Sequence, residues 1–396
     1  MEEHSWIQEA ADKIRDKLAA VAERNQGRLP FGRNTEQSKE DYFRTGNPFC
    51  WENGLGGGLM WQMVHATQDR TCMKNAVDLE SALAGNLRSP EKLGPVAGYQ
   101  FLPTAVANFH MTRNEVSKQR GLDAAKAMAG CFLPDKGYLA LCPLLVTEKE
   151  ESGRSRTEDC AEQAAAGEDD STSHGRTAGE DDRVLHSISA VEIAAEPVLS
   201  VDSLLQLPLL YWASETTRDE TYRGIASMHA AAVLHQLVRE DGSVLPAAAA
   251  GSRADAQALA LYGFGLSYLH TSDQQFLKAA EKTAAYFLSE LPDSGRVPEI
   301  LGAEDQAGEN DFAAAAASCG LILLSGLVRE DRDNVPPVSA ALARAYAVAA
   351  LRMLQALCRD RVDYRAETDT LLGDPAGDYF LTEAVWKLIG RELFIW

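Results

Sequence analysis

Residues 200–219 read SVDSLLQLPLLYWASETTRD, and this stretch predicts the fold of the whole chain. An apolar, helix-like run with Pro208 inside it ends in Thr217-Arg218-Asp219. An Asp at that place accepts hydrogen bonds from the unpaired amides at the start of the next helix. The stretch therefore indicates a buried helix, a sharp turn and a second helix.

The same turn sequence, Thr-x-Asp or Thr-x-Asn after a helix-like run, occurs four times along the chain. The four Thr residues are Thr67, Thr112, Thr217 and Thr271, at intervals of 45, 105 and 54 residues. The longest interval contains an insertion, so each unit is predicted to be one helical hairpin of about 50 residues. A chain of 396 residues holds roughly six such hairpins. They can form an open superhelix or close into an (α/α)6 toroid.

The remaining sequence supports an all-α fold. Ala-rich segments with apolar residues three and four apart recur, for example at 7–21, 225–238 and 340–357, and alternating β-branched runs are nearly absent. Residues 147–182 differ, because they contain no Leu, Ile, Val, Phe, Tyr or Trp and carry twelve acidic and four basic residues. Such a segment cannot bury enough apolar surface to fold. We expect a disordered acidic loop inserted in a single domain that spans residues 1–396.

The charge of the chain restricts its partners. Lys and Arg total 38 and Asp and Glu total 58, so the formal net charge is −20. This surplus repels phosphate backbones and anionic lipid surfaces, so we expect neither a nucleic acid nor a membrane as partner. The apolar stretches are also expected to be too short to span a bilayer.

The cysteine and histidine spacings predict no bound metal. The seven cysteines are scattered, with no C-x-x-C pair, and no His or carboxylate spacing typical of a metal site occurs. We therefore propose no metal and no cofactor. Free thiols are typical of a reducing compartment, so a cytoplasmic location is expected.

Two segments carry candidate functional residues. Residues 49–61, FCWENGLGGGLMW, join aromatic rings that could stack on sugars to glycines that let a ligand approach the backbone. A tight helix-entry turn with core Trp residues is the alternative. Asp202 is a lone carboxylate at the start of an apolar helix. Burial would raise its pKa, which would suit it to general acid catalysis. The alternative is that Asp202 is the N-cap of the helix. His229, on an Ala-rich helix, is expected to pack and not to catalyse.

Five stretches, in the same order, resemble glycoside hydrolase family 88, the unsaturated glucuronyl hydrolases. The catalytic-acid segment of that family is similar to residues 201–214, VDSLLQLPLLYWAS. The resemblance covers nearly the whole chain outside the acidic insertion and implies the closed (α/α)6 toroid. The other stretches are Trp51 to Trp61, Phe101 to Asn114, Gln257 to Tyr268, and Ala313 to Leu321 together with Gly377 to Ala384.

The resemblance also implies an activity. Enzymes of this family hydrate the 4,5-double bond of an unsaturated uronic acid at the non-reducing end of an oligosaccharide. Asp202 matches the carboxyl group that protonates C4 and then activates water for C5, and Trp51, Asn53 and Gln257 match residues that line the site. An unsaturated rhamnogalacturonyl hydrolase, which shares the toroid and the mechanism, is a close alternative.

Several positions depart from the family pattern. Pro95 and Val96 stand where the family has His-Asp, Pro246 stands where it has a histidine, and Asp255 and Leu259 stand where it has Arg and Trp. These exchanges leave open a second class of function, a pseudoenzyme that uses the toroid to bind sugars or proteins. The polysaccharide of origin, the linkage and the oligomeric state are not determined by the sequence.

Overall fold

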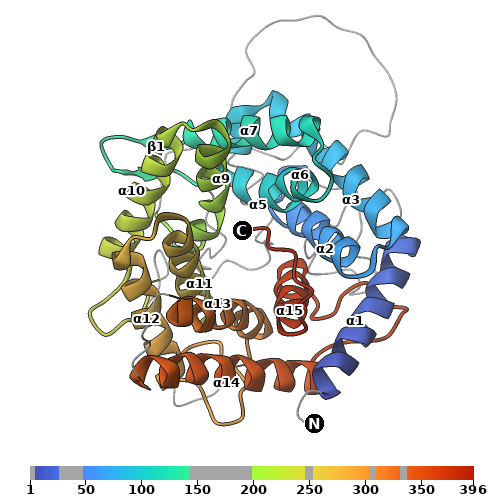
Figure 1. Cartoon of the computed structure of the whole chain (residues 1–396), viewed down its shortest axis with the longest axis vertical. Coiled ribbons are helices and arrows are strands. Elements are labelled where there is room, and N and C mark those ends of the chain that lie inside the picture. Colours follow the sequence, from blue (N-terminus) through green and yellow to red (C-terminus); the bar gives the residue numbers. More distant parts are fainter. Residues whose placement is uncertain (1–4, 26–47, 142–198, 246–252, 303–307, 331–336) are drawn as a thin grey trace, which may run out of the picture.

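The computed structural model describes residues 5–25, 48–141, 199–245, 253–302, 308–330 and 337–396. Within these residues the helices alternate along the chain between an outer and an inner position around one axis (Figure 1). The outer helices are α1 (Ser5–Arg24), α3 (Arg70–Leu83), α7 (Glu115–Ala129), α10 (Glu220–Leu237), α12 (Gln274–Ser289) and α14 (Pro337–Asp360).

The inner positions are occupied partly by continuous helices and partly by broken ones. The continuous helices are α2 (Glu52–Thr67), α11 (Ala254–Thr271), α13 (Asp311–Glu330) and α15 (Pro375–Leu388). The broken ones are α5 (Ala97–Phe101), which continues through a π-helix η3 (Leu102–Val106) into α6 (Ala107–Thr112), and the 3-10 helix η4 (Val201–Gln206), which leads into α9 (Pro208–Thr217).

The short elements of the described residues lie in the connections. The elements η1 (Ala84–Arg88), α4 (Pro90–Leu93) and η2 (Gly94–Val96) connect α3 to α5. Strands β1 (Phe132–Leu133) and β2 (Tyr138–Leu139) follow α7 as an antiparallel pair, with Phe132 opposite Leu139. The acidic segment 147–182 lies outside the described residues, and its disorder stays a prediction.

The ring of inner helices is closed. Each inner element packs against the next around the axis, and the last of them, α15, packs against the first, α2 (Figure 1). An open superhelix would keep its first and last helices apart. The α2–α15 contact therefore confirms the (α/α)6 toroid over the open alternative.

The inner helices approach one another so closely that glycine is required at their contacts. A Cβ atom on Gly98 of α5 would lie 2.4 Å from the Cβ of Gln206 in η4. On Gly54 of α2 it would lie 2.0 Å from the carbonyl oxygen of Tyr99. Both distances are below any normal contact, so neither position accepts a side chain without backbone movement. The same holds for Gly263 of α11, where a Cβ atom would lie 2.4 Å from the Cβ of Leu204.

Two of these helices are long and apolar enough to cross a membrane by length and composition. They are α13, over Asp311–Val328, and α14, over Ala340–Asp360. The expectation that every apolar stretch is too short is therefore wrong for these two helices. In the toroid 72% of the first segment and 50% of the second are buried, as is usual for core helices of a globular domain.

Four inner helices pass into the following outer helix through the same turn, which confirms the predicted repeat. The Thr hydroxyl donates to the carbonyl oxygen four residues earlier at 2.6–2.9 Å and accepts the amide two residues later at 3.2–3.3 Å. The Asp or Asn then caps the next helix. Each middle residue is left-handed: Gln68 (φ 60°), Arg113 (60°), Arg218 (62°) and Ser272 (57°).

The connections between helices differ in length at the two ends of the toroid. All four turns lie where an inner helix ends, whereas the connections that lead into the N-termini of inner helices are longer, such as residues 84–96 and 361–374. Binding and catalytic residues are over-represented in loops that a rigid scaffold positions. The N-terminal ends of the inner helices are therefore where a functional site is expected.

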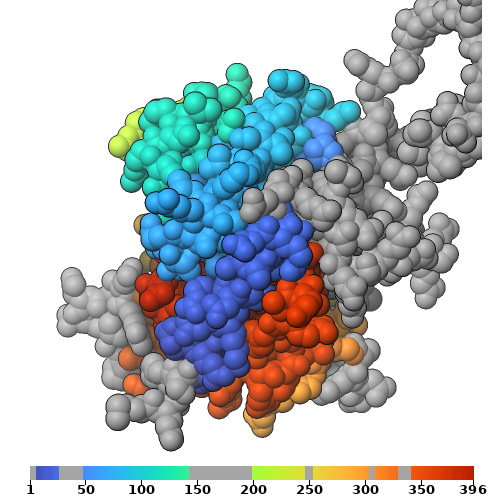
Figure 2. All heavy atoms as spheres, turned by 90° about the vertical axis from the view of Figure 1, so that its right-hand side faces the viewer, coloured from blue at the N-terminus to red at the C-terminus, as the bar shows by residue number. Residues whose placement is uncertain are grey.

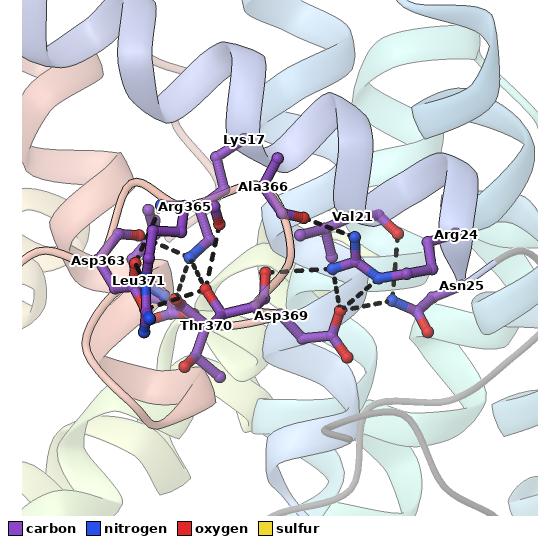
Figure 3. Close-up of polar contacts among 12 residues, drawn as sticks. Lys17, Val21, Arg24, Asn25, Asp363, Arg365, Ala366, Asp369, Thr370 and Leu371 are labelled. Atoms are coloured by element: carbon purple, nitrogen blue, oxygen red, sulfur yellow. Dashed lines mark hydrogen bonds and ion pairs between the residues drawn. The ribbon is translucent and has the colours of Figure 1, made fainter. Parts of the chain in front are cut away.

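Helix α1 closes the outer ring between the first and last hairpins. Figure 2 shows α1, in dark blue, between the light-blue segment after residue 50 and the orange-red C-terminal segment. Lys17 is 2% exposed, and its Nζ donates to the carbonyl oxygen of Asp363 at 2.6 Å, to the Thr368 hydroxyl at 2.7 Å and to the carbonyl oxygen of Thr370 at 2.5 Å (Figure 3). Burial lowers the pKa of this ammonium, so its charge depends on these three acceptors.

Arg24 and Asn25 extend the same attachment toward the end of α1. The guanidinium of Arg24 donates to the carbonyl oxygen of Ala366 at 2.6 Å and to the buried carboxylate of Asp369 (Figure 3). The side-chain amide of Asn25 donates to the same carboxylate at 3.0 Å. The loop that leads into α15 is thus held by polar contacts from the first helix of the chain.

We expect Ser272→Gly to stabilise the protein by roughly 0.5–1 kcal/mol, because glycine adopts the left-handed conformation without a Cβ clash. Ser272→Ala is the matched control, since alanine removes the hydroxyl and keeps the clash. Urea unfolding of the two variants measures the difference. Equal stability of the two variants would show that the turn is not strained.

We expect Lys17→Met to destabilise the protein by roughly 2–4 kcal/mol, because three acceptors, one of them buried, lose a charged donor. Lys13→Met on the same helix is the control, since the Lys13 side chain is 50% exposed and pairs with Glu9 on the surface. Thermal unfolding of both variants measures the effect. A similar small loss in both would argue against a role of Lys17 in ring closure.

Candidate functional site

Asp202 lies at the predicted end of the toroid, in the first turn of η4. Its side chain is fully buried, and the Ser200 hydroxyl donates to its Oδ1. The N-cap residue of η4 is Ser200, and it makes no side-chain cap bond. The N-cap alternative for Asp202 is therefore wrong, because the carboxylate lies inside the helix and not at its cap position.

Tyr99 joins Asp202 to Trp51. The Tyr99 hydroxyl donates to the backbone carbonyl oxygen of Asp202 at 2.6 Å, and the ring centroids of Tyr99 and Trp51 are 5.4 Å apart. Burial, with a smaller contribution from the Asp202 charge, raises the pKa of Tyr99 well above its usual value, so the phenol remains a donor. No sequence motif identifies Tyr99; its only signal is its place after Gly98 in the segment that departs from the family pattern.

The segment before α2 is held by buried amide side chains. Gln100 Nε2 donates to the carbonyl oxygens of Pro48 and Cys50, both at 2.9 Å. Asn86 Nδ2 donates to Pro48 at 2.8 Å and to Gln100 Oε1 at 2.9 Å. Asn53, fully buried, donates to the same Pro48 oxygen at 3.4 Å. These bonds fix the start of α2 beside Trp51, and the predicted substrate contact of Asn53 stays a prediction.

Gln257 lies in the first turns of α11 with its side chain fully buried. Its Nε2 donates to the carbonyl oxygens of Gly242 at 2.7 Å and Thr283 at 2.9 Å, and its Oε1 accepts the Val244 amide at 3.0 Å. The side chain thereby ties the 241–245 turn and α12 to the inner ring. Its predicted role in substrate binding stays a prediction.

Asp255, which stands at the position of a family arginine, is compensated by a neighbour. The Arg253 guanidinium contacts both carboxylate oxygens, with Nε at 3.1 Å from Oδ1 and Nη2 at 2.7 Å from Oδ2. Asp255 is 2% exposed, and Glu299 Oε1 lies 3.7 Å from Arg253 Nη2. The start of α11 therefore presents an ion pair with a second carboxylate nearby, and not an isolated cation.

The other departures lie in the connection to α5. Val96 is 3% exposed, so an apolar side chain fills the place of the second family carboxylate. Gln206 of η4 binds this region through Oε1, which accepts the Gly98 amide at 3.1 Å, and through Nε2, which donates to the Pro95 carbonyl oxygen at 3.2 Å. Pro246 lies outside the described residues.

His229 of α10 is buried beside the Asp202 segment. Its exposure is 0%, its Nδ1 accepts the Leu139 amide at 3.0 Å, and its Nε2 lies 2.6 Å from the Ser203 hydroxyl. Burial lowers its pKa to about 3. The ring is therefore neutral at physiological pH.

Among the described residues, no group of three or more His, Cys, Asp or Glu side chains is arranged to hold a metal ion. The chain matches no protein-family model.

The curated relatives carry two related names. The chain is 23% identical over 306 residues to the unsaturated glucuronyl hydrolase of Bacillus sp. strain GL1, covering 71% of this chain and 68% of that protein. It is 26% identical over 227 residues to the unsaturated chondroitin disaccharide hydrolase of Streptococcus pyogenes serotype M1, and there it spans only 55% of the relative.

The chain is similar to unsaturated glucuronyl hydrolases in sequence and in fold.

Solved structures of this family share the fold over nearly the full chain. The Bacillus sp. GL1 enzyme aligns with a TM-score of 0.74 and 20% identity over 96% of both chains. The unsaturated glucuronyl hydrolase of Streptococcus agalactiae aligns with a TM-score of 0.76 and 20% identity, over 98% of this chain and 93% of that one. At such identities the alignment concerns the toroid and not the chemistry of the site.

Acidification is expected to weaken the fold through His229. Its pKa is about 3 in the folded protein and about 6.5 in an unfolded chain. Between these values the unfolded chain binds a proton that the folded protein does not, so stability present above pH 6.5 is lost as the pH falls. The expected loss between pH 7 and pH 5 is about 2 kcal/mol.

The measurement is urea unfolding of the wild type and of His229→Gln at both pH values. The comparison is needed because burial raises the pKa of Asp378 to about 7, which contributes the opposite trend in both proteins. A pH dependence that is the same in both proteins would contradict the prediction.

Proposed function

We propose that the chain is a glycoside hydrolase that acts on unsaturated uronyl oligosaccharides, with Asp202 as its acid and base. The observation that carries this proposal is the position of Asp202: a buried carboxylate in the family's catalytic segment, held at the end of the toroid where the long connections gather. The names of the curated relatives support this substrate class.

The proposed reaction is the hydration of the 4,5-double bond. The Asp202 carboxyl group gives its proton to C4, and the cation that forms at C5 is stabilised by the ring oxygen. The carboxylate then takes a proton from water as the water oxygen bonds to C5. The resulting hemiketal opens to a ketone, C1 releases the neighbouring sugar as an alcohol, and one water is consumed for each bond broken.

Three further residues are proposed to bind the sugar. Trp51 is only partly buried, and aromatic rings of this kind stack on sugar faces. Asn53 and Gln257 are proposed to contribute side-chain amides at the same end of the inner helices, Gln257 through Oε1, because both hydrogens of its Nε2 are donated to Gly242 and Thr283. Tyr99, between Trp51 and Asp202, sets the distance between the stacking ring and the acid.

A non-catalytic sugar- or protein-binding role is the second candidate, favoured by two observations. Val96 places a buried apolar side chain where the family has a carboxylate, and Asp255 is neutralised by Arg253. A site altered in this way could bind a sugar without turning it over. An unsaturated rhamnogalacturonyl substrate is a third candidate and differs only in the sugar released.

A cytoplasmic location is also proposed. Among the described cysteines, Cys72, Cys131, Cys319 and Cys358 are free thiols. Thiols that stay reduced are typical of proteins in reducing compartments.

Asp202→Asn should abolish turnover and keep the toroid folded, because Asn preserves the shape of the side chain but transfers no proton. A group that both protonates carbon and activates water contributes at least about 10²–10⁴-fold to the rate. Turnover is followed as the loss of enol-ether ultraviolet absorbance with unsaturated uronyl disaccharides, charged and uncharged. Asp219→Asn is the matched control, since Asp219 caps α10 on the surface and Asn serves the same function.

Unchanged turnover in Asp202→Asn would move the chemistry to another residue. Wild-type protein that binds the disaccharides in calorimetry without any loss of absorbance would favour the binding module over the hydrolase.

A further inference from the structure

We infer that His229 is a positioning residue for Asp202, acting from the outer ring through Ser203 and Ser200. This inference rests on the proposed function, because it concerns how the proposed acid is held. The three side chains and Asp202 form one buried cluster with exposures of 0–3%.

The cluster is a continuous path of hydrogen bonds. The Leu139 amide donates to His229 Nδ1 at 3.0 Å, and His229 Nε2 lies 2.6 Å from the Ser203 hydroxyl. The Ser203 hydroxyl donates to the backbone carbonyl oxygen of Ser200, whose own hydroxyl donates to Asp202 Oδ1. Elements β2, α10 and η4 are thus linked by hydrogen bonds, and Ser200 connects this link to the carboxyl group that is proposed to react.

The direction of every bond in this path is determined. Because Nδ1 of His229 accepts an amide hydrogen, the neutral ring carries its proton on Nε2 and donates it to Ser203. The Ser203 hydrogen is then directed at the Ser200 carbonyl. A second proton on the ring would point at the Leu139 amide, so the neutral tautomer is the one that fits.

The Asp202 segment needs such a support. The element η4 is a six-residue 3-10 helix, its N-cap Ser200 makes no side-chain cap bond, and a helix of this length and type is weak by itself. Tyr99 holds the Asp202 carbonyl from α5. His229 of α10 holds the next residue, Ser203, so the backbone around Asp202 is bound by both an inner and an outer helix.

Two variants distinguish a positioning role of His229 from a packing role. In His229→Gln the side-chain amide nitrogen can take the place of Nε2 and still donate to Ser203, whereas the Leu139 amide loses its acceptor. In His229→Asn the amide oxygen can take the place of Nδ1 and still accept from Leu139, whereas the bond to Ser203 is lost. Both variants are neutral and polar, and each deletes one of the two bonds.

We expect kcat to fall roughly 10–100-fold in His229→Asn and to stay within about threefold of wild type in His229→Gln, with KM little changed in both. Ser203→Ala, which keeps His229 and removes the same link, should match His229→Asn, and Ser203→Thr should restore kcat. His235→Asn, near the exposed end of the same helix, is the control and should leave kcat unchanged.

Melting temperatures of all variants are measured beside the kinetics. A loss of kcat that follows the melting temperature and is equal in His229→Asn and His229→Gln would overturn the inference and leave His229 as a packing residue. If either His229 variant does not fold, the Ser203 pair decides alone: equal kcat in Ser203→Ala and wild type would overturn the inference. Absence of turnover in the wild type would instead overturn the proposed function and this inference with it.

Discussion

The close approach of neighbouring inner helices is the constraint on which the rest of the structure depends. Closing the ring brings the backbones of α2, α5 and η4 so near one another that Gly54 and Gly98 have no room for a Cβ atom. The same approach places Tyr99 within hydrogen-bonding distance of the Asp202 backbone and in ring contact with Trp51. A larger residue at either glycine would separate the helices and disturb the proposed acid as well as the core.

Polar side chains join the two rings at a small number of buried points. Lys17 connects α1 to the loop before α15, Gln257 connects α11 to α12, and His229 connects α10 to η4. Lys17 and Gln257 bind mostly backbone atoms, and His229 binds one backbone amide and one hydroxyl. A buried polar group that loses its partner lowers the stability of the fold. These contacts therefore determine which outer helix packs against which inner helix.

The scaffold and the chemistry of this protein have diverged to different extents. The toroid aligns with its relatives over 96% of the chain, whereas the start of α11 has an Asp255–Arg253 ion pair and the start of α5 has the apolar Val96. Exchanges at the ends of inner helices do not disturb the glycine contacts along them. The site could therefore change its charge without a change of fold.

The sequence by itself determined the helices, the four Thr-x-Asp/Asn turns and the segment that holds Asp202, because each depends on residues within a few positions of one another. The tertiary structure alone decided three things: closure by α2 against α15, the bridge of Tyr99 between Trp51 and Asp202, and the contact of His229 with Ser203. These contacts join residues that are 26 or more positions apart. Local sequence patterns do not predict contacts between residues so far apart in the chain. Those contacts form only when the ring of helices closes.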